Sequence, residues 1–284
     1  MNAREAVVSG SAFLFVPGDR PDRFAKARQA GPDVVVLDLE DAVAPPAKDE
    51  ARAHVVRWLE AGGEAVVRVN AVGTPWHQRD LEALTGVATC VMLPKAEDAA
   101  AVAAVGAATG LPLVALLETP RAFFDVLEIL RRPGVVRAAI GTIDLAAELG
   151  VDPDDGAALG WARSTLVAAA AAAGLPRPLD GVTTNLADGA KLAGDVRSAR
   201  QSGFGGKLCI HPGQVGAVQA GFSPTAEELE WARSVLAAAG QGVAAIGGHM
   251  VDPPVIRRAE RLLAGARHAP GVELPEGKEG SGSC

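Results

Sequence analysis

Charged side chains follow several of the apolar runs in this chain, and two of them suit a metal ion. Glu118 follows the run Leu113–Leu117, and Asp144 comes shortly after Val135–Ile140. Two carboxylates without a nearby His or Cys cluster suit a hard cation, Mg2+ or Mn2+, that keeps several waters and takes oxygen from a substrate. Helix capping is the alternative, since acidic residues often begin helices and Asp144 could cap the one after its run.

An arginine in a neighbouring run suits a carboxylate. Arg68 lies in the alternating segment Val66-Val67-Arg68-Val69-Asn70, whose apolar residues should hold it at the end of a buried strand. A guanidinium binds a carboxylate through two parallel hydrogen bonds, so Arg68 and a metal ion together would fix a dicarboxylate or an α-keto acid. A salt bridge from Arg68 to Asp38, Glu40 or Asp41 is the alternative, and the sequence leaves it open.

The acidic segment Asp38–Asp41 follows another apolar run. It could supply a general base, or it could orient Arg68 and a metal-bound water. We count Glu40 and Asp41 among the catalytic residues and favour the orienting role. His211 is interpreted as a hydrogen-bonded loop residue, and the cysteines of the apolar runs as packing residues.

Apolar runs of strand length alternate along the chain with amphipathic segments of helical pattern. This alternation indicates the strands and helices that position the charged side chains. The predicted strands are Ala12–Val16, Val34–Leu39, Ala65–Val69, Cys90–Leu93, Leu113–Leu117, Val135–Ile140, Pro178–Val182 and Lys207–Ile210. Continuous apolar strands indicate a parallel sheet covered by helices, and eight is the number in a (β/α)8 barrel. A doubly wound sheet would give the same alternation, but no Gly-x-Gly-x-x-Gly turn follows the first run. In a barrel, residues after the strands share one catalytic rim.

The predicted fold class is therefore α/β, a (β/α)8 TIM barrel with a C-terminal helical extension. The predicted helices include Pro21–Ala30, Lys48–Leu59, Glu97–Thr109, Pro120–Leu130, Leu186–Gln201 and Thr225–Ala239. We assign residues 1–222 to the catalytic barrel, 223–270 to the helical extension and 271–284 to a flexible tail. The tail is assigned on its Gly, Glu and Ser content.

Composition narrows the class of partner. A formal net charge of −7, from 34 acidic and 27 basic residues, argues against nucleic acid, which needs a basic surface. Small-molecule partners are favoured instead. No signal-like apolar segment or membrane-length apolar stretch is found, and the three cysteines form neither a disulfide framework nor a metal-ligand spacing. We expect a cytoplasmic protein without a membrane partner.

The motifs in order resemble those of the citrate lyase β-subunit-like family, within the HpcH/HpaI aldolases and malyl-CoA lyases. The residues that carry the resemblance are Leu14-Phe15-Val16-Pro17-Gly18 with Arg20 and Lys26, Leu37–Val43, Arg68-Val69-Asn70, Leu93-Pro94-Lys95, Leu117–Pro120, Gly141–Leu145, Gly206–Pro212 and Val251–Pro254. They extend from about residue 11 to residue 265. The resemblance covers most of the chain.

The resemblance implies roles for particular residues. Glu118 and Asp144 become the Mg2+ ligands, and Arg68 becomes the residue that binds the substrate carboxylate. The positions that contact the coenzyme A ester in malyl-CoA lyases are matched by Phe15, Arg20 and Lys26. The two cations could alternatively be ordinary surface residues. Asp252 matches an aspartate that a neighbouring subunit contributes for proton transfer, whereas its sequence context alone indicates a helix N-cap before Pro253.

The activity that the resemblance implies is Mg2+-dependent cleavage of a β-hydroxyacyl-CoA thioester of malyl, citramalyl or citryl type. The products would be an α-keto acid and an acyl-CoA, with coenzyme A as part of the substrate. The resemblance also implies a homo-oligomer, a trimer or hexamer, in which the C-terminal extension packs on a neighbouring subunit. The alternatives are a malyl-CoA-type thioesterase, an aldolase for free 2-keto acids, and a citrate lyase β-subunit that acts on a carrier-linked substrate.

Overall fold

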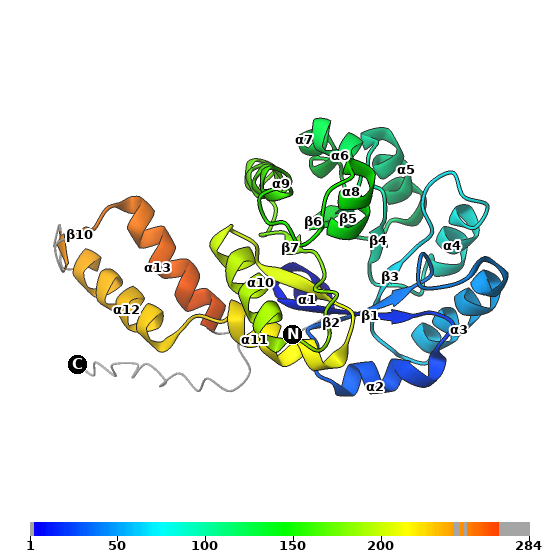
Figure 1. Cartoon of the computed structure of the whole chain (residues 1–284), viewed down its shortest axis with the longest axis horizontal. Helices are drawn as coiled ribbons and strands as arrows, with labels where there is room; N and C mark the ends of the chain where they lie inside the picture. The colour runs from blue at the N-terminus through cyan, green and yellow to red at the C-terminus, as the bar shows by residue number, and fades with distance from the viewer. Residues whose placement is uncertain (1–2, 241–244, 247–248, 267–284) are drawn as a thin grey trace, which may run out of the picture. The chain divides into compact units, whose positions relative to one another are not determined.

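The computed structural model describes residues 3–240, 245–246 and 249–266, which form two compact units, Met1–Phe222 and Ser223–Cys284. The first unit is a closed barrel of eight parallel strands in the order β1 to β8, surrounded by helices (Figure 1). The strands are β1 (Ala12–Pro17), β2 (Val34–Asp38), β3 (Val66–Arg68), β4 (Val91–Leu93), β5 (Leu113–Leu117), β6 (Val135–Ile140), β7 (Leu179–Asp180) and β8 (Gly206–Cys209). The expected (β/α)8 barrel is confirmed.

Each strand pairs with the next in parallel, and β1 also pairs with β8 through Ala12 and Lys207, which closes the barrel. Alternate side chains of the strands point inward and form one apolar cluster. This cluster contains Phe13, Val34, Val36, Val66, Cys90, Met92, Val114, Leu116, Ala139, Leu179 and Leu208. A second, larger cluster lies between the strands and the surrounding helices. Burial on both faces explains why the strands are apolar throughout.

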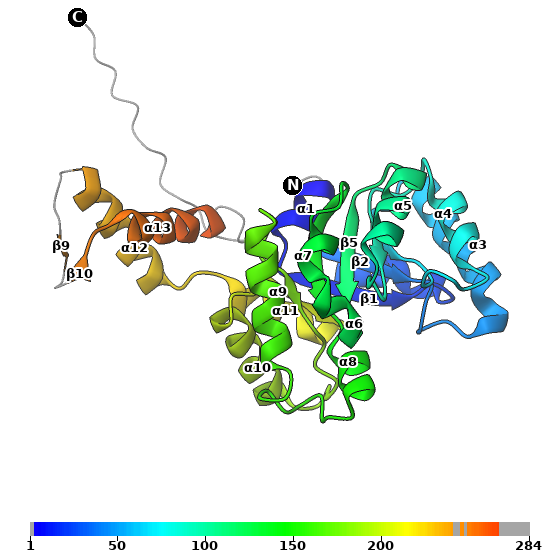
Figure 2. The ribbon, with the colours of Figure 1, turned by 90° about the horizontal axis from the view of Figure 1, so that it is seen from above.

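The helices of the barrel unit surround the strands (Figure 2). The α-helices are α1 (Ala3–Ser9), α2 (Phe24–Gln29), α3 (Lys48–Glu60), α4 (His77–Leu84), α5 (Ala99–Thr109), α6 (Pro120–Phe124), α7 (Val126–Leu130), α8 (Thr142–Leu149), α9 (Gly160–Ala172), α10 (Gly189–Gln201) and α11 (Val215–Phe222). Three 3-10 turns are η1 (Pro21–Arg23), η2 (Pro45–Ala47) and η3 (Pro212–Gln214). Among the described helices, none is both long and apolar enough to cross a membrane.

The predicted strands agree with the observed ones to within two residues at each end, but two predicted helices were wrong in detail. Pro120–Leu130 is not one helix, because Asp125 leaves the helical conformation and separates α6 from α7. The first part of Pro21–Ala30 is the 3-10 turn η1 rather than α-helix. In both segments a proline at the first turn starts a helix correctly, but local packing sets how far it continues.

Helix α1 closes the N-terminal end of the barrel. Ala6 and Val7 of this helix belong to the interior apolar cluster. Arg137 of β6 is buried in the same region and donates hydrogen bonds to the carbonyls of Val7 and Gly10 at 2.8 and 2.7 Å. Its guanidinium also lies over the ring of Phe13, 5.4 Å from the centroid. A buried cation at the C-terminal end of α1 suits the carbonyls that the helix leaves unpaired.

The second unit contains two helices and a short antiparallel strand pair. They are α12 (Ala226–Gly240), β9 (Ala245–Ile246), β10 (His249–Met250) and α13 (Pro253–Ala266). Ala232, Val235 and Ala259 form a buried apolar cluster in this unit. The guanidinium of Arg258 lies 4.7 Å from the centroid of the Trp231 ring. The predicted flexible tail, residues 271–284, lies outside the described residues.

Candidate active site

Arg68, the last residue of β3, is held by the acidic segment that follows β2. Its Nε and Nη2 donate to the two carboxylate oxygens of Asp38 at 2.7 and 2.6 Å. The backbone amides of Glu40 and Ala42 donate to the same carboxylate, which fixes its orientation. The salt bridge that the sequence left open is therefore present. It occupies the Nε–Nη2 edge of the guanidinium. Nη1 lies near Glu40, and within the described residues the remaining N–H groups of Nη1 and Nη2 make no hydrogen bond.

Glu40 connects Arg68 to a second cation. Its Oε2 lies 3.1 Å from Arg68 Nη1, without the alignment of a hydrogen bond, and its Oε1 accepts a 2.6 Å hydrogen bond from Lys95 Nζ. Burial raises the pKa of Glu40, and the charges of Arg68 and Lys95 oppose that rise. Burial lowers the pKa of Arg68, but the charges of the surrounding acids outweigh it and raise that pKa above its usual value.

Glu118 lies directly after β5 and is almost completely buried, with 2% of its surface exposed. Its Oε1 accepts a 2.9 Å hydrogen bond from the backbone N–H of Lys95, whereas Oε2 accepts none within the described residues. Burial, aided by the nearby charge of Glu40, raises the pKa of Glu118 to about 8. A buried carboxylate with an unused oxygen is stabilised by an added cation.

Asp144 lies in the first turn of α8 and is half-buried. The helix is capped by Gly141, and no side chain makes a capping hydrogen bond, so the capping alternative for Asp144 is wrong. After burial and the charge of Glu40, the charge of Asp144 adds a smaller contribution to the raised pKa of Glu118. Gly141, the N-cap of the helix that carries Asp144, lies against Glu118, and a Cβ there would stand 2.5 Å from Glu118 Oε2.

The two carboxylates fit a hard divalent cation. Within the described residues, no three His, Cys, Asp or Glu side chains converge on one point. A metal ion at this site would therefore need ligands other than these side chains. Mg2+ usually takes one or two carboxylates and completes its coordination with water and substrate oxygen. The oxygen donors of Glu118 and Asp144, and the unused Oε2, match that preference.

Lys48 is a buried residue of this region that the sequence did not single out. Its ammonium donates to the carbonyls of Leu39 and Glu40, both at 2.7 Å, and lies 5.3 Å from the centroid of the Trp76 ring. These two hydrogen bonds fix the backbone of the acidic segment that follows β2. The sequence offers no signal for this role, because a lysine in the first turn of a helix is usually exposed.

The three residues that match coenzyme A contacts, Phe15, Arg20 and Lys26, do not lie together in the structure: one packs within the site and two are exposed. The Phe15 ring lies under the guanidinium of Arg68, 4.9 Å from its central carbon, so it packs within the site. Arg20 pairs with Asp22 at 3.1 Å and is exposed, as the surface alternative predicts. Lys26 is exposed on α2. The structure therefore brings Phe15 to Arg68, and leaves the other two on the surface beside β1.

Asp252 caps a helix, as its sequence context indicates. Its Oδ1 accepts a 3.0 Å hydrogen bond from the backbone of Val255 in the first turn of α13. It belongs to the second compact unit, whereas the other candidate residues belong to the first. His211 likewise accepts a hydrogen bond from the backbone of Gly213, which confirms its interpretation as a loop residue.

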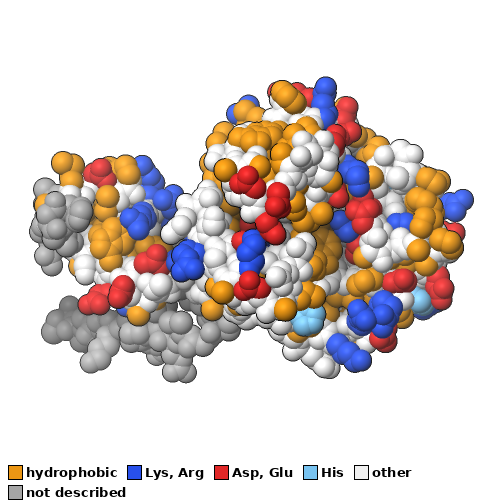
Figure 3. Space-filling model, viewed as in Figure 1, with side chains coloured by type: hydrophobic (Ala, Val, Ile, Leu, Met, Phe, Trp, Pro, Cys, Tyr) orange, Lys and Arg blue, Asp and Glu red, His pale blue; other side chains and the backbone are white. Residues whose placement is uncertain are grey.

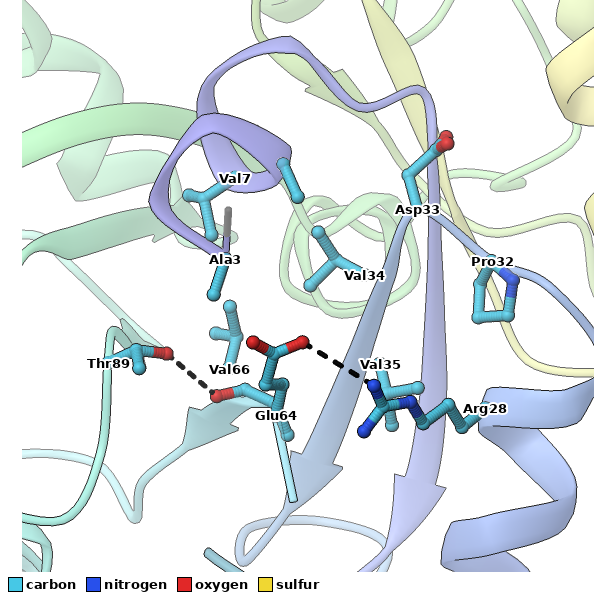
Figure 4. Close-up of a pocket in the computed structure, with 12 residues that line it drawn as sticks. Ala3, Val7, Arg28, Pro32, Asp33, Val34, Val35, Glu64, Val66 and Thr89 are labelled. Carbon is cyan, nitrogen blue, oxygen red and sulfur yellow. Dashed lines mark hydrogen bonds and ion pairs between the residues drawn. The ribbon is translucent and has the colours of Figure 1, made fainter. Parts of the chain in front are cut away.

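A cavity of about 160 Å3 lies at the opposite end of the barrel from these acids (Figure 4). Its walls are the first residues of β2 and β3, with Ala6 and Val7 of α1. Glu64 points toward Arg28, and their charged atoms are 3.7 Å apart. The lining mixes apolar residues with Arg28, Asp33, Glu64 and Thr89. Residues at this end of a barrel usually serve stability rather than catalysis. We therefore place the candidate active site at the C-terminal ends of β2 to β6.

Comparison with known proteins decides the family. Residues 11–212 match the model of the HpcH/HpaI aldolase/citrate lyase family. The chain belongs to this family. The resemblance seen in the motifs is thereby confirmed, as is the expectation of a lyase-type enzyme.

Relatives of known name cover nearly the whole chain. A citrate lyase subunit beta-like protein of Mycobacterium tuberculosis is 43% identical over 279 residues, 95% of this chain and 99% of that protein. A (3S)-malyl-CoA thioesterase of Cereibacter sphaeroides is 36% identical over 268 residues, 90% of this chain and 94% of that protein. The family thus contains proteins named for different reactions of related substrates.

A solved structure shows the same fold with ligands. The crystal structure of CitE from M. tuberculosis in complex with magnesium, acetoacetate and coenzyme A has a TM-score of 0.80 and 40% identity. The match covers 91% of this chain and 98% of CitE. Magnesium and coenzyme A in CitE are the metal and the carrier that the sequence predicts for this family member.

Proposed function

We propose that this family member is a Mg2+-dependent carbon–carbon lyase for a β-hydroxyacyl-CoA thioester of malyl, citramalyl or citryl type. The observation that carries the proposal is the pairing of a buried carboxylate, Glu118, with an arginine at the same rim. Glu118 is buried, and one of its two oxygens accepts no hydrogen bond within the described residues, so that oxygen is available to a cation. Arg68 keeps N–H groups for a substrate carboxylate. The ligands bound by the CitE structure support the same choice.

Glu118 and Asp144 would hold Mg2+, and Mn2+ could substitute for it because both prefer oxygen ligands. When bound, the cation supplies fixed positive charge against the oxygen on which negative charge develops. Arg68 binds the substrate carboxylate and aligns it for bond cleavage. Asp38 keeps the guanidinium in one orientation through its two hydrogen bonds.

Cleavage requires a base for the substrate hydroxyl proton. Asp41 is the more available acid of its segment: its side chain is 57% exposed and 4.0 Å from Arg68, whereas Glu40 is occupied by Lys95. As the proton leaves, the hydroxyl-bearing carbon forms a carbonyl and the carbon–carbon bond breaks. Its electron pair passes to the thioester as an enolate. Asp252 of a neighbouring subunit would protonate the enolate carbon, directly or through water, to give the acyl-CoA.

Substitution of the metal ligands tests this proposal. We expect Glu118→Gln and Asp144→Asn to reduce Mg2+-dependent turnover by about 100-fold or more while the far-UV circular dichroism spectrum stays that of the folded wild type. Glu128→Gln, on the exposed surface of α7, is the matched control and should behave as the wild type. Full activity in either ligand variant would refute the metal assignment.

A thioesterase is the second candidate, because the Cereibacter sphaeroides relative carries that name. Such an enzyme would release free coenzyme A from a malyl-type thioester without forming a keto acid. A citrate lyase β-subunit is the third, supported by the name of the mycobacterial relative. In that case the isolated protein would cleave a carrier-linked substrate and leave soluble CoA esters intact.

A further inference from the structure

Lys95 has an unusual backbone conformation at the edge of the candidate site. It follows β4 after a single proline, and its φ is +48°. Among the residues that the structure describes, it is the one non-glycine residue with a positive φ. This left-handed region is disfavoured for a residue with a Cβ, and such conformations concentrate at functional sites where surrounding contacts maintain them.

The backbone and the side chain of Lys95 bind different parts of the site. Its N–H donates to Glu118 Oε1 at 2.9 Å, while the next amide, that of Ala96, donates to the Leu116 carbonyl at 3.1 Å. Its ammonium donates to Glu40 Oε1 at 2.6 Å. The other oxygen of Glu40 lies 3.1 Å from Arg68 Nη1. A single residue therefore contacts the candidate metal ligand and the partner of the candidate carboxylate-binding arginine.

We propose that Lys95 is a positioning residue that holds Glu118 and Arg68 in their working orientations through two separate groups. The inference rests on the proposed function and adds a residue to it. The backbone N–H fixes one oxygen of Glu118, which leaves the other oxygen directed to the cation. The ammonium keeps the Glu40 carboxylate against Arg68, whose remaining N–H groups then face the substrate.

The ion pair between Lys95 and Glu40 differs from a surface salt bridge in its burial. The carboxylate partner, Glu40, is 6% exposed, and Lys95 itself is 39% exposed, so the pair is formed at the boundary of the buried site. Hydrogen bonds to charged groups in such places contribute more than exposed ion pairs do. Lys191 of α10 is a lysine with similar partners. It pairs with Asp195 of the same helix and with Asp154, and it pairs with none of the candidate residues.

Two substitutions separate the two groups of Lys95. Lys95→Gly keeps the backbone N–H and accepts a positive φ without steric cost, but it lacks the ammonium. Lys95→Val lacks the ammonium and, as a β-branched residue, strongly disfavours a positive φ, so it also displaces the N–H. Lys191→Met is the matched control. The readouts are the Kd of Mn2+ measured by electron paramagnetic resonance, and the Kd of pyruvate measured calorimetrically with Mn2+ present.

In Lys95→Gly we expect the Kd of Mn2+ to stay within about threefold of wild type and the Kd of pyruvate to rise about tenfold. In Lys95→Val we expect the Kd of Mn2+ to rise about tenfold as well. Lys95→Arg, which keeps a cation, should recover pyruvate binding in part.

An unchanged pyruvate Kd in Lys95→Gly overturns the proposal, even if Lys95→Val does not yield folded protein. An equal loss of Mn2+ binding in both variants overturns the backbone role. If the wild-type protein binds neither Mn2+ nor pyruvate, the proposed function itself fails. If it binds both and the Lys95 variants match Lys191→Met, only the role of Lys95 fails.

Discussion

At the scale of single residues, Arg68 is both a structural ion-pair partner and a candidate substrate-binding group. Asp38 takes two of its five N–H groups, at 2.7 and 2.6 Å. Lysine cannot reproduce this forked pair and still reach a substrate. The two interpretations that the sequence left open are therefore compatible, because the salt bridge sets the orientation of the groups that remain.

Arg68→Lys should reduce kcat/KM by about 100-fold, mostly through a raised KM for the thioester, because carboxylate alignment is lost while the cationic charge is kept. Steady-state kinetics with a malyl-type thioester would measure this. Arg132→Lys, in an exposed ion pair with Glu128, is the control and should be silent. Unaltered kinetics of Arg68→Lys would remove the arginine from the substrate site.

The raised pKa of Glu118 predicts a pH dependence of metal binding. Because this pKa is about 8 in the folded protein without metal, the carboxylate is largely protonated at pH 6 and must lose its proton to bind a cation. The Kd of Mg2+ should therefore fall about tenfold for each pH unit from 6 toward 8. Isothermal titration calorimetry would measure it, and a flat profile would contradict the shift.

The same shift has a consequence for stability. A carboxyl whose folded pKa lies above its unfolded value stabilises the fold at low pH and loses that contribution as pH rises through the folded pKa. Without metal, Glu118→Gln should therefore gain unfolding temperature relative to wild type between pH 6 and 8. Added Mg2+ should reverse this difference, because it stabilises only the wild type.

Several site residues could be predicted from the sequence, and others could not. Glu118 and Arg68 are evident because a charged residue at the end of an apolar strand has to face the catalytic rim of a barrel. Lys48 carries no such signal, because its role depends on carbonyls that the segment after β2 brings to it. Lys95 does follow an apolar run, but its contacts with Glu40 and Glu118 and its positive φ could not be predicted from its residue type.

At the scale of elements, the junction of β6 and α8 sets the shape of the metal site. Gly141 caps α8 with an ordinary negative φ of −94°, so its need for glycine is steric. A Cβ there would lie 2.5 Å from both Cβ and Oε2 of Glu118. The glycine thus lets the helix that carries Asp144 approach the end of β5.

Gly141→Ala should weaken Mg2+ binding at least about tenfold and destabilise the fold by about 1–3 kcal/mol, since Glu118 has to move. The matched control is Gly194→Ala within α10, where a Cβ meets nothing within 4 Å. It should stabilise the protein by about 0.5–1 kcal/mol. Thermal unfolding and Mg2+ titration of both variants measure this. Normal metal affinity in Gly141→Ala would contradict the proposed arrangement.

The order and type of the barrel strands could be predicted because they are apolar on both faces and separated by helical segments. The ends of elements were less accessible. The strand predicted at Pro178–Val182 keeps only Leu179 and Asp180, whose carboxylate accepts hydrogen bonds from Arg163 and Lys207. Ion pairs between neighbouring elements depend on tertiary structure, and the periodicity of apolar residues along the sequence does not predict them.

At the scale of the whole molecule, the chain consists of two compact units, and Asp252 lies in the second. On the visible face, acidic and basic side chains are interspersed among apolar ones (Figure 3). If Asp252 completes the site of a neighbouring subunit, as we propose, the active enzyme is an oligomer and each site uses residues from two chains.

Complementation tests this directly. Glu118→Gln and Asp252→Asn should each be nearly inactive alone, whereas a mixture refolded together should regain about a quarter of wild-type activity, because some sites combine two intact residues. The light-scattering mass should show a trimer or hexamer. No recovery from the mixture, with each variant folded, would show that Asp252 does not act across subunits.

The central claim is tested most directly by the products. Purified protein with Mg2+ is incubated with malyl-, citramalyl- and citryl-CoA, and glyoxylate, pyruvate, oxaloacetate and free thiol are measured together. Our account predicts that one thioester yields a keto acid and an acyl-CoA in equal amounts. It also predicts that EDTA or Glu118→Gln abolishes this yield. Release of free thiol without any keto acid, or turnover unaffected by EDTA, would contradict it.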